Sequence, residues 1–461
     1  MQDNPMFRQI VQTTSVLAAG LLLAAPLHAN PYETVLDNGL KVIVKEDRRA
    51  PSVVHMVWYG VGAMDEPDGR SGIAHMLEHM MFKGTEKIGP GQFNQRVAAL
   101  GGRDNAFTGS DYTAYFQQIP PVHLGEMMML EADRMANLEI TEAEFLPEQQ
   151  VVREERRLRI DDSPRALVFE QLMATAFQAH PYRRPIIGWM TDIEDYTVED
   201  ARAWYDNWYA PNNARLVVVG DIDHEEVFAL ARKHYGPIPA RTLPQRHISR
   251  EPEQRGPRHT TVRAPAELPF VTLAWHAPTL RDVKADEDVY ALQVLAAVLD
   301  GYDGARVPRR LVREQRIAVS AGASYDGTGR GPSLFVVSAS PAAGHTVAEV
   351  ETALRAEIAR VAREGIGEDE LHRVRTQAVA AEVFKRDSLM GQAMEIGFLE
   401  STGLSWRDEA ALLEGVRRVT AEQVQAVAQR YFGETTMTRA ELDPLPLADG
   451  ARRLPAPAQR H

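Results

Sequence analysis

The chain has 461 residues, of which 44% are hydrophobic and 25% are charged, and its formal net charge at pH 7 is −13. This is the composition of a globular protein long enough for two large domains, at roughly 100–200 residues per domain. The acidic balance and the lack of a long lysine- or arginine-rich run argue against nucleic acid or an anionic membrane as the main partner. The sequence contains no cysteine, which excludes disulfides and cysteine-linked lipid anchors.

Residues 1–29 have the pattern of an export signal. Arg8 supplies a weakly positive start, and residues 15–26 (SVLAAGLLLAAP) form an apolar segment too short to span a bilayer. Ala29 ends a small-residue cleavage site. A buried N-terminal helix is the alternative, but Asn30-Pro31 interrupts its continuation. We therefore expect a cleaved signal peptide and a mature periplasmic chain without a membrane anchor.

The first half combines β-branched and aromatic runs, which favour strands, with apolar patterns of helical period. We expect strands at residues 40–46, 53–59 and 215–220 and helices within residues 91–101, 122–209 and 225–235.

The second half repeats this order of elements. From residue 236 to 263 the composition changes to proline, arginine and polar residues, and we place an interdomain linker at 241–263. The sequence therefore predicts two α+β domains with similar folds, at residues 30–240 and 264–461. Within the second, we expect strands at 270–275, 317–325 and 333–339 and helices at 286–300 and within 346–432.

The sequence HMLEH at residues 75–79 is the strongest chemical signal. On a helix, His75 and His79 lie one turn apart on the same face, so both imidazoles can bind one metal ion. Glu78 lies beside them, within reach of a zinc-bound water, and can accept its proton as hydroxide attacks a carbonyl. This is the H-x-x-E-H pattern of zinc peptidases. The second half has no such cluster at its equivalent helix, so the chemistry belongs to the first half.

A catalytic zinc needs a third protein ligand, and residues 147–160 offer one. On a helix, Glu148 and Glu155 share an apolar stripe with Val151, Val152 and Leu158. A carboxylate on a buried face must be paired or bind a metal. We assign Glu155 as the third ligand and Glu148 as a carboxylate that orients a histidine or assists the site. In the alternative interpretation, both carboxylates only pair with nearby arginines such as Arg153 or Arg156, while Glu154 is solvated or paired with Arg157.

These motifs resemble the pitrilysin and insulinase-type inverzincins, particularly their short bacterial and mitochondrial-processing-peptidase-like branch. The stretches that carry the resemblance are HMLEHMMFKGT (75–85), EQQVVREE (148–155), NAFTGSDYTAY (105–115) and HPYRRPIIG (180–188). The resemblance covers nearly the whole mature chain. It implies two homologous domains, each a mostly antiparallel sheet packed with helices, which form half of a clamshell around a chamber. It also implies one Zn²⁺ per chain, with its third ligand at Glu155.

Residues 105–115 resemble the substrate-binding strand of that family. An edge strand has unpaired backbone groups to which an extended peptide can add as a further strand. By the resemblance, Asn105 and Ala106 hold the substrate backbone and Phe107 shapes an apolar subsite. An ordinary internal strand is the alternative. Residues 180–182 are interpreted as a structural turn that positions helices.

The second domain departs from the family pattern. Self-sufficient members carry a segment like L-R-E-x-x-G-L-A-Y, whose arginine and tyrosine contact substrate. Here, within 311–320, Arg313 is present as a candidate substrate contact, but Val319 occupies the tyrosine position and cannot donate a hydrogen bond to an oxyanion. Tyr325 is a possible substitute. We therefore expect a dimer, most simply a heterodimer with a related metal-free subunit that carries the Arg/Tyr pair, with a homodimer as the other possibility.

The resulting expectation is a zinc metalloendopeptidase that hydrolyses peptides or unfolded segments inside a closed chamber, with Glu78 as general base. The alternatives are a metal-free scaffold of the same fold and a peptide-binding subunit whose zinc is structural. Zinc content tests the first. Glu78→Gln tests the second, because binding should persist while turnover disappears.

Overall fold

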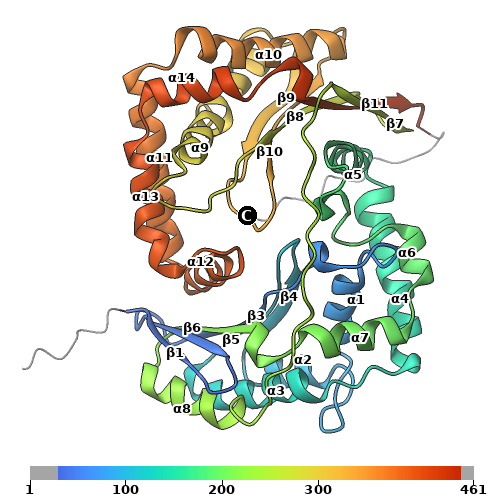
Figure 1. Cartoon of the computed structure of the whole chain (residues 1–461), viewed down its shortest axis with the longest axis vertical. Helices are drawn as coiled ribbons and strands as arrows, with labels where there is room; N and C mark the ends of the chain where they lie inside the picture. The colour runs from blue at the N-terminus through green and yellow to red at the C-terminus, as the bar shows by residue number, and fades with distance from the viewer. Residues whose placement is uncertain (1–29, 448–461) are drawn as a thin grey trace, which may run out of the picture.

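The computed structural model describes residues 30–447, so the predicted export signal lies outside the described residues. The fold is mixed α/β, with two sheets and many helices, as predicted (Figure 1). None of the helices between residues 30 and 447 combines the length and apolar composition that a bilayer crossing requires.

The first sheet has the strand order β1-β2-β6-β3-β5-β4, and β4 lies at its edge. All neighbours are antiparallel except β2 and β6, which are parallel. The strands predicted at 40–46, 53–59 and 215–220 correspond to β2, β3 and β6, whereas the edge strand β1, with only four residues, was not predicted. The strands are β1 (Tyr32–Val35), β2 (Lys41–Glu46), β3 (Val53–Tyr59), β4 (Arg103–Thr108), β5 (Thr113–Ile119) and β6 (Ala214–Gly220).

The second sheet repeats the pairing of the first. Its order is β7-β11-β8-β10-β9, with β7 and β11 parallel and the other pairs antiparallel. Apart from β1, which has no counterpart, the two sheets therefore correspond strand by strand, and β9 occupies the edge position that β4 has in the first. The strands are β7 (Arg258–Pro265), β8 (Phe270–Ala277), β9 (Ala318–Tyr325), β10 (Ser333–Pro341) and β11 (Met437–Leu445).

Helices follow the strands in both halves. Those of the first are α1 (Ile73–Met80), α2 (Gln92–Ala99), α3 (Leu124–Asn137), α4 (Glu142–Arg156), α5 (Pro164–Ala176), α6 (Met190–Asp195), α7 (Val198–Trp208) and α8 (His224–His234). Those of the second are α9 (Glu287–Asp300), α10 (Val347–Glu364), α11 (Glu368–Arg386), α12 (Leu389–Ser401), α13 (Glu409–Arg418) and α14 (Ala421–Arg430).

Two expectations need correction. The linker predicted at 241–263 overlaps β7, which begins at Arg258. β7 pairs with β11 on one side only, and most of its residues are half-buried or exposed. Its sequence is therefore polar, and the polar composition does not predict a strand. The stretch 105–115 is not one strand but the hairpin of β4 and β5. Gly109, Ser110 and Asp111 are turn formers, and they separate the two strands.

Each half lends a helix to the sheet of the other (Figure 1). Helix α12 packs on β3 and β6 of the first sheet, where Leu389 and Ile396 meet Met56 and Trp58. Helix α5, from the first half, packs on β7, β8 and β11 of the second sheet. Because both apolar faces are covered by exchange, the two halves share their cores.

Candidate functional site

Helix α1 carries the histidines and the glutamate of the HMLEH sequence. Its apolar residues Ile73, Met76, Leu77 and Met80 are buried in the first core, which fixes the rotation of the helix. The first turn has no side-chain cap of its own. Instead, the buried carboxylate of Glu66 accepts hydrogen bonds of 2.9 Å from the backbone N–H groups of Gly72 and Ala74. These bonds satisfy amide groups that the start of a helix leaves unpaired.

The HPYRRPIIG stretch packs against this helix start. Gly188 lies so close to Ser71 and Gly72 that a Cβ at Gly188 would come within 2.2 Å of the Ser71 carbonyl oxygen. Gly72 has φ +89°, a conformation that glycine adopts readily. The Ser71 hydroxyl accepts a hydrogen bond from the Trp189 N–H and donates one to Asp192. The stretch therefore anchors the position of α1.

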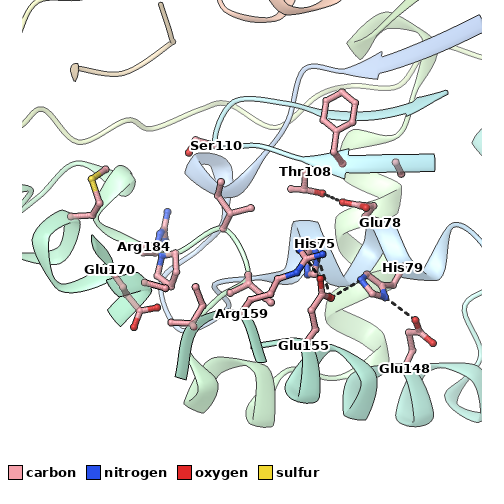
Figure 2. A pocket seen from close by; sticks show the side chains of 18 of the residues that line it. His75, Glu78, His79, Thr108, Ser110, Glu148, Glu155, Arg159, Glu170 and Arg184 are labelled. Carbon is pink, nitrogen blue, oxygen red and sulfur yellow. Dashed lines mark hydrogen bonds and ion pairs between the residues drawn. The ribbon is translucent and has the colours of Figure 1, made fainter. Parts of the chain in front are cut away.

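Helix α4 brings two carboxylates to the side of α1. Buried Val152 packs in the first core and sets the face of α4 that carries Glu148 and Glu155 toward α1 (Figure 2). The predicted stripe is only partly buried, because Val151 and Leu158 are exposed. The helix changes to a π-helical turn, η3 (Arg157–Asp161), so its rotation after Arg156 does not follow the regular period.

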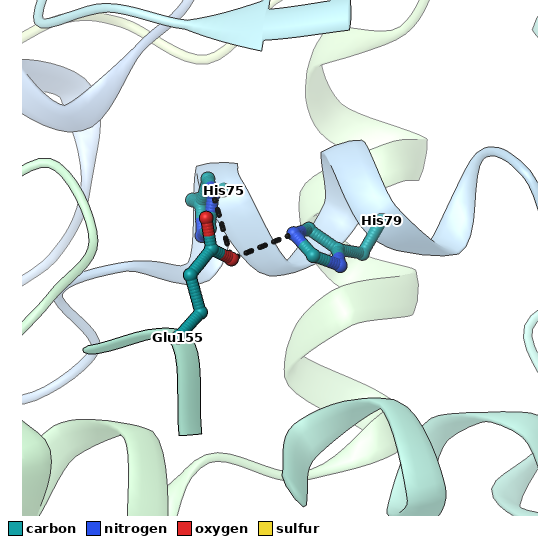
Figure 3. Close-up of side chains that lie close together, drawn as sticks. All are labelled: His75, His79 and Glu155. Carbon is teal, nitrogen blue, oxygen red and sulfur yellow. Dashed lines mark ion pairs between the residues drawn. The ribbon is translucent and has the colours of Figure 1, made fainter. Parts of the chain in front are cut away.

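The structure brings His75, His79 and Glu155 together (Figure 3). Glu155 Oε2 lies 3.3 Å from His79 Nε2 and 3.8 Å from His75 Nε2. A tetrahedral ion with bonds of about 2.0–2.1 Å places its ligand atoms about 3.4 Å apart, so the three groups fit zinc. Among the described residues, they are the only such ligand-type cluster that lines the cavity.

Arg153 and Arg156 do not form the ion pairs with Glu148 and Glu155 that the alternative interpretation of α4 requires. Arg156 pairs with Glu170, and Arg153 pairs with Glu194. Glu154 pairs with Arg157 on the exposed side of the helix, as expected. Neither Arg153 nor Arg156 therefore neutralises Glu148 or Glu155. Glu155 does use its second oxygen, Oε1, for an ion pair of 2.7 Å with the exposed Arg159, which leaves Oε2 directed at the histidines.

Glu148 holds one histidine in a defined orientation. Its Oε1 lies 2.7 Å from His79 Nδ1, and its Oε2 pairs with Lys83. Although burial opposes the charged imidazole, hydrogen bonds to Glu148 and Glu155 raise the pKa of His79 to about 9. Donation from Nδ1 to Glu148 leaves Nε2 as the nitrogen that faces Glu155, which suits a metal ligand. Burial and the neighbouring His79 lower the pKa of His75 to about 4.

Glu148→Gln should weaken zinc binding by about 10–100-fold, because an amide holds His79 Nδ1–H less strongly than a carboxylate does. The measurement is zinc retention during titration with a competing chelator. Glu142→Gln, an exposed change on the same helix, is the control. Equal zinc affinity in Glu148→Gln and the parent chain would contradict the orienting role.

Glu78 lies across from the three-residue cluster, next to β4. Its Oε2 accepts a hydrogen bond of 2.5 Å from the Thr108 hydroxyl at the end of that strand (Figure 2). Burial raises the pKa of Glu78, and the Thr108 hydrogen bond opposes the rise only in part. A raised pKa brings a carboxylate nearer to the range in which it can both accept and return a proton at neutral pH.

A cavity of about 1000 Å³ connects these groups with β4. Asn105, Ala106 and Phe107 line it, together with His75, Glu78, His79 and Glu155. Apolar side chains from α5 and the 185–187 segment line another part of its wall, together with the polar residues Glu170, Tyr182 and Arg184. Since β4 is the edge strand, its outer backbone groups face away from β5. The arrangement can therefore hold an extended chain beside the cluster of His75, His79 and Glu155.

The second-half candidates lie elsewhere. Arg313 is in the π-helical segment η6 (Pro308–Glu314) and does not line the cavity. Val319 is exposed on β9. The Tyr325 hydroxyl donates to the Pro278 carbonyl, so Tyr325 does not replace the missing tyrosine at this cavity.

Lys83, Thr108 and Tyr182 are cavity residues that sequence reasoning did not select. Lys83 lies beyond the end of α1 at Met80, so helical spacing does not indicate its contact with Glu148. The bond between Thr108 and Glu78 joins a strand to a helix, and no local pattern signals such a contact.

Two family models match the chain. The model described as insulinase, peptidase family M16, matches residues 41–189 and includes α1 and α4. The model described as peptidase M16 inactive domain matches residues 195–378. The boundary between the two matches falls within α6, before the linker.

Relatives with the name zinc protease also match. Zinc protease PqqE of Helicobacter pylori is 35% identical over 324 residues, which is 68% of this chain and 71% of that protein. An uncharacterized zinc protease of Mycobacterium leprae is 28% identical over 408 residues, 88% of this chain and 90% of that protein.

Solved structures share the fold. A protease from Helicobacter pylori has a TM-score of 0.85 at 29% identity, over 90% of this chain and 100% of that chain. The periplasmic protease PqqL from Escherichia coli has a TM-score of 0.76 at 19% identity. The match covers 92% of this chain but only 49% of PqqL, which is therefore about twice as long.

Proposed function

This chain belongs to the insulinase-type M16 family of peptidases, and we propose that it is a zinc-dependent endopeptidase that hydrolyses peptides or unfolded segments. The observation that carries the proposal is the convergence of His75, His79 and Glu155 opposite Glu78, in a cavity bordered by an edge strand. The zinc protease names of relatives support the same chemistry.

In the proposed mechanism, His75 Nε2, His79 Nε2 and Glu155 Oε2 would hold one zinc ion per chain. Zinc bound there supplies Lewis acidity, which favours deprotonation of water and polarises the peptide carbonyl. Glu78 accepts the proton of the attacking water and then donates it to the leaving amide nitrogen. Thr108 keeps one Glu78 oxygen fixed by its hydrogen bond, so the other remains available for proton transfer. Glu148 keeps the His79 ring oriented.

The substrate is proposed to bind as an added strand beside β4. Backbone groups of Asn105 and Ala106 would hold the peptide main chain, and the half-buried ring of Phe107 would contact an apolar side chain. Because main-chain bonding does not depend on side-chain identity, this binding mode favours extended or unfolded segments over folded proteins.

The active unit is proposed to be a dimer that closes a chamber. PqqL, whose chain is about twice as long, supports an arrangement of two such units. Since Arg313 lies outside the cavity of its own chain and Val319 lacks a donor, a related subunit with an Arg/Tyr pair would complete the site. A homodimer is the alternative. The predicted signal at residues 1–29 makes the periplasm the proposed location.

The second candidate is a scaffold or peptide-binding subunit without turnover. The description of the second family model as an inactive domain gives this candidate its weight. That model matches residues 195–378, however, whereas the proposed metal ligands and Glu78 lie in the part matched by the insulinase model. The distribution of residues therefore favours the peptidase.

Cleavage of a quenched fluorescent peptide by residues 30–461 tests the proposal. We expect turnover in zinc-containing buffer, loss of turnover after chelation, and recovery when zinc is added back. If the chain alone is inactive, a related metal-free subunit that carries the Arg/Tyr pair is added, and we expect it to restore peptide cleavage. Zinc binding without turnover under both conditions would favour the scaffold candidate.

A further inference from the structure

The turns of two equivalent hairpins meet at the junction of the two halves. One is the β4–β5 turn around residues 109–112, next to the proposed substrate strand. The other is the β9–β10 turn around residues 326–332, at the corresponding place in the second sheet. Arg330, at the tip of the second turn, reaches into the first half.

The Arg330 side chain forms a paired ion contact with Asp65. Its Nη1 and Nη2 donate to the two Asp65 carboxylate oxygens at 2.8 and 2.9 Å. The Asp65 side chain is 2% exposed and that of Arg330 is 15% exposed, so water screens this pair weakly. The planar guanidinium matches the carboxylate with two parallel bonds, which fixes direction as well as distance.

The backbone of the same loop holds the β4–β5 turn through Asp111. The Arg330 N–H donates to Asp111 Oδ2 at 2.9 Å, and the Tyr182 hydroxyl donates to Asp111 Oδ1 at 2.7 Å. The Gly331 N–H in turn donates to the Tyr182 oxygen at 2.9 Å. Burial raises the pKa of Tyr182, so the phenol stays protonated and keeps both bonds.

The loop can approach this closely because Gly331 has no side chain. A Cβ at this position would lie 2.4 Å from His180 Cε1 and 2.6 Å from Tyr182 Cε2. The sequence interpretation gave residues 180–182 a helix-positioning role. In the structure, His180 and Tyr182 form the surface on which the second-half loop rests.

These contacts lead directly to the substrate strand. Asp65 ends the short helix η1 (Ala63–Asp65), whose Ala63 N–H donates to the Gly109 carbonyl at 3.1 Å. The Met64 N–H donates to the Ser110 carbonyl at 2.9 Å. Two sets of contacts thus hold the turn that follows β4. Helix η1 binds the carbonyls of Gly109 and Ser110, and Tyr182 and the Arg330 N–H bind Asp111 within the turn. Arg330 takes part in both, because its side chain also binds Asp65 of η1.

We propose that Arg330 is a positioning residue, which fixes the end of β4 so that a peptide can add to this strand at the correct distance from Glu78. The inference rests on the proposed peptide hydrolysis. It gives the second half, which carries none of the proposed ligands, a role in substrate binding within its own chain. Arg330 acts through Asp65 and Asp111 and does not line the cavity itself.

Arg330→Ala is compared with Arg330→Lys and with Lys41→Ala. Lys41 forms the matched control, because it also joins the halves by an ion pair, with Glu400 at 2.8 Å, but lies away from β4. For each variant, KM and kcat are measured with the peptide substrate, zinc content is determined, and amide hydrogen exchange is followed in residues 103–119.

For Arg330→Ala we expect KM to rise roughly ten-fold while kcat changes by less than about three-fold, because Arg330 does not line the cavity that contains Glu78 and the proposed metal ligands. Zinc content should be unchanged, and exchange in residues 103–119 should become about three-fold faster or more. Arg330→Lys should recover part of both effects, since it keeps the charge but not the paired geometry. Lys41→Ala should leave KM and this exchange unchanged.

The proposal would be overturned if Arg330→Ala had the same KM as Lys41→Ala and the same rate of amide hydrogen exchange in residues 103–119. If the parent chain does not cleave peptides under any condition, the proposed function fails, and the exchange comparison alone still decides the positioning role. If Arg330→Ala does not fold, Arg330→Gln takes its place in the same comparison.

Discussion

Glu78→Gln is expected to lower kcat by about 10²–10⁴-fold while zinc stays bound. Glutamine keeps the size of the side chain and can retain the contact with Thr108, but it cannot accept the proton of the attacking water. Glu78 is not among the three clustered ligand groups, so its loss should not change metal content. Burial raises the pKa of Glu78, which means that the charged form is disfavoured there, and the neutral amide should not destabilise the fold.

The measurement is single-turnover peptide cleavage together with zinc analysis and thermal unfolding. Glu86→Gln, an exposed glutamate a short distance after α1, is the control and should behave as the parent chain. Turnover within ten-fold of the parent chain in Glu78→Gln would remove Glu78 from the mechanism. Loss of zinc would instead make Glu78 part of the metal site.

Glu155→Gln should lose both zinc and activity. The carboxylate supplies the only negative charge among the three clustered groups, and an amide is a much poorer ligand for zinc. Zinc affinity should fall by more than the ~10–100-fold that the loss of an orienting partner costs. Glu155→Gln should therefore lower zinc affinity more than Glu148→Gln does.

Competition with a chelator measures this affinity. Glu154→Gln is a close control, because Glu154 is next to Glu155 in the chain but its side chain is exposed and pairs with Arg157. Arg159→Gln separates loss of the Arg159 ion pair from loss of the ligand, and it should retain zinc. Unchanged zinc affinity in Glu155→Gln would show that another group supplies the third ligand.

The sequence alone was sufficient for the local elements of the candidate site. The spacing of His75 and His79 predicts that both lie on one face of a helix, and α1 carries both histidines toward Glu155. The strand expected at 53–59 has those bounds in the structure, since its β-branched and aromatic residues are buried on both faces. The repeated order of elements correctly indicated two halves, and the strand pairing of the two sheets shows the same repeat.

Sequence patterns misled where burial depends on distant partners. The apolar stripe of α4 predicted Val151 and Leu158 as buried, yet nothing packs over them sufficiently to cover them in the described chain. The sequence of β7 has the composition of a linker, and only its pairing with β11 makes it a strand. In the 105–115 stretch, strand-forming residues flank the turn residues at 109–111, and these turn residues divide the stretch into β4 and β5.

The sequence by itself determined the proposed ligand types, their spacing on α1, and the two-fold repeat of α+β elements. These follow from periodicities of a few residues, which depend on backbone geometry alone. Only the tertiary structure decided that α5 and α12 exchange sheets, that Thr108 meets Glu78, and that Arg330 reaches Asp65. Such contacts join residues far apart in the chain, and an apolar face or a charge has no local feature that specifies its partner. They are fixed when the two halves pack together.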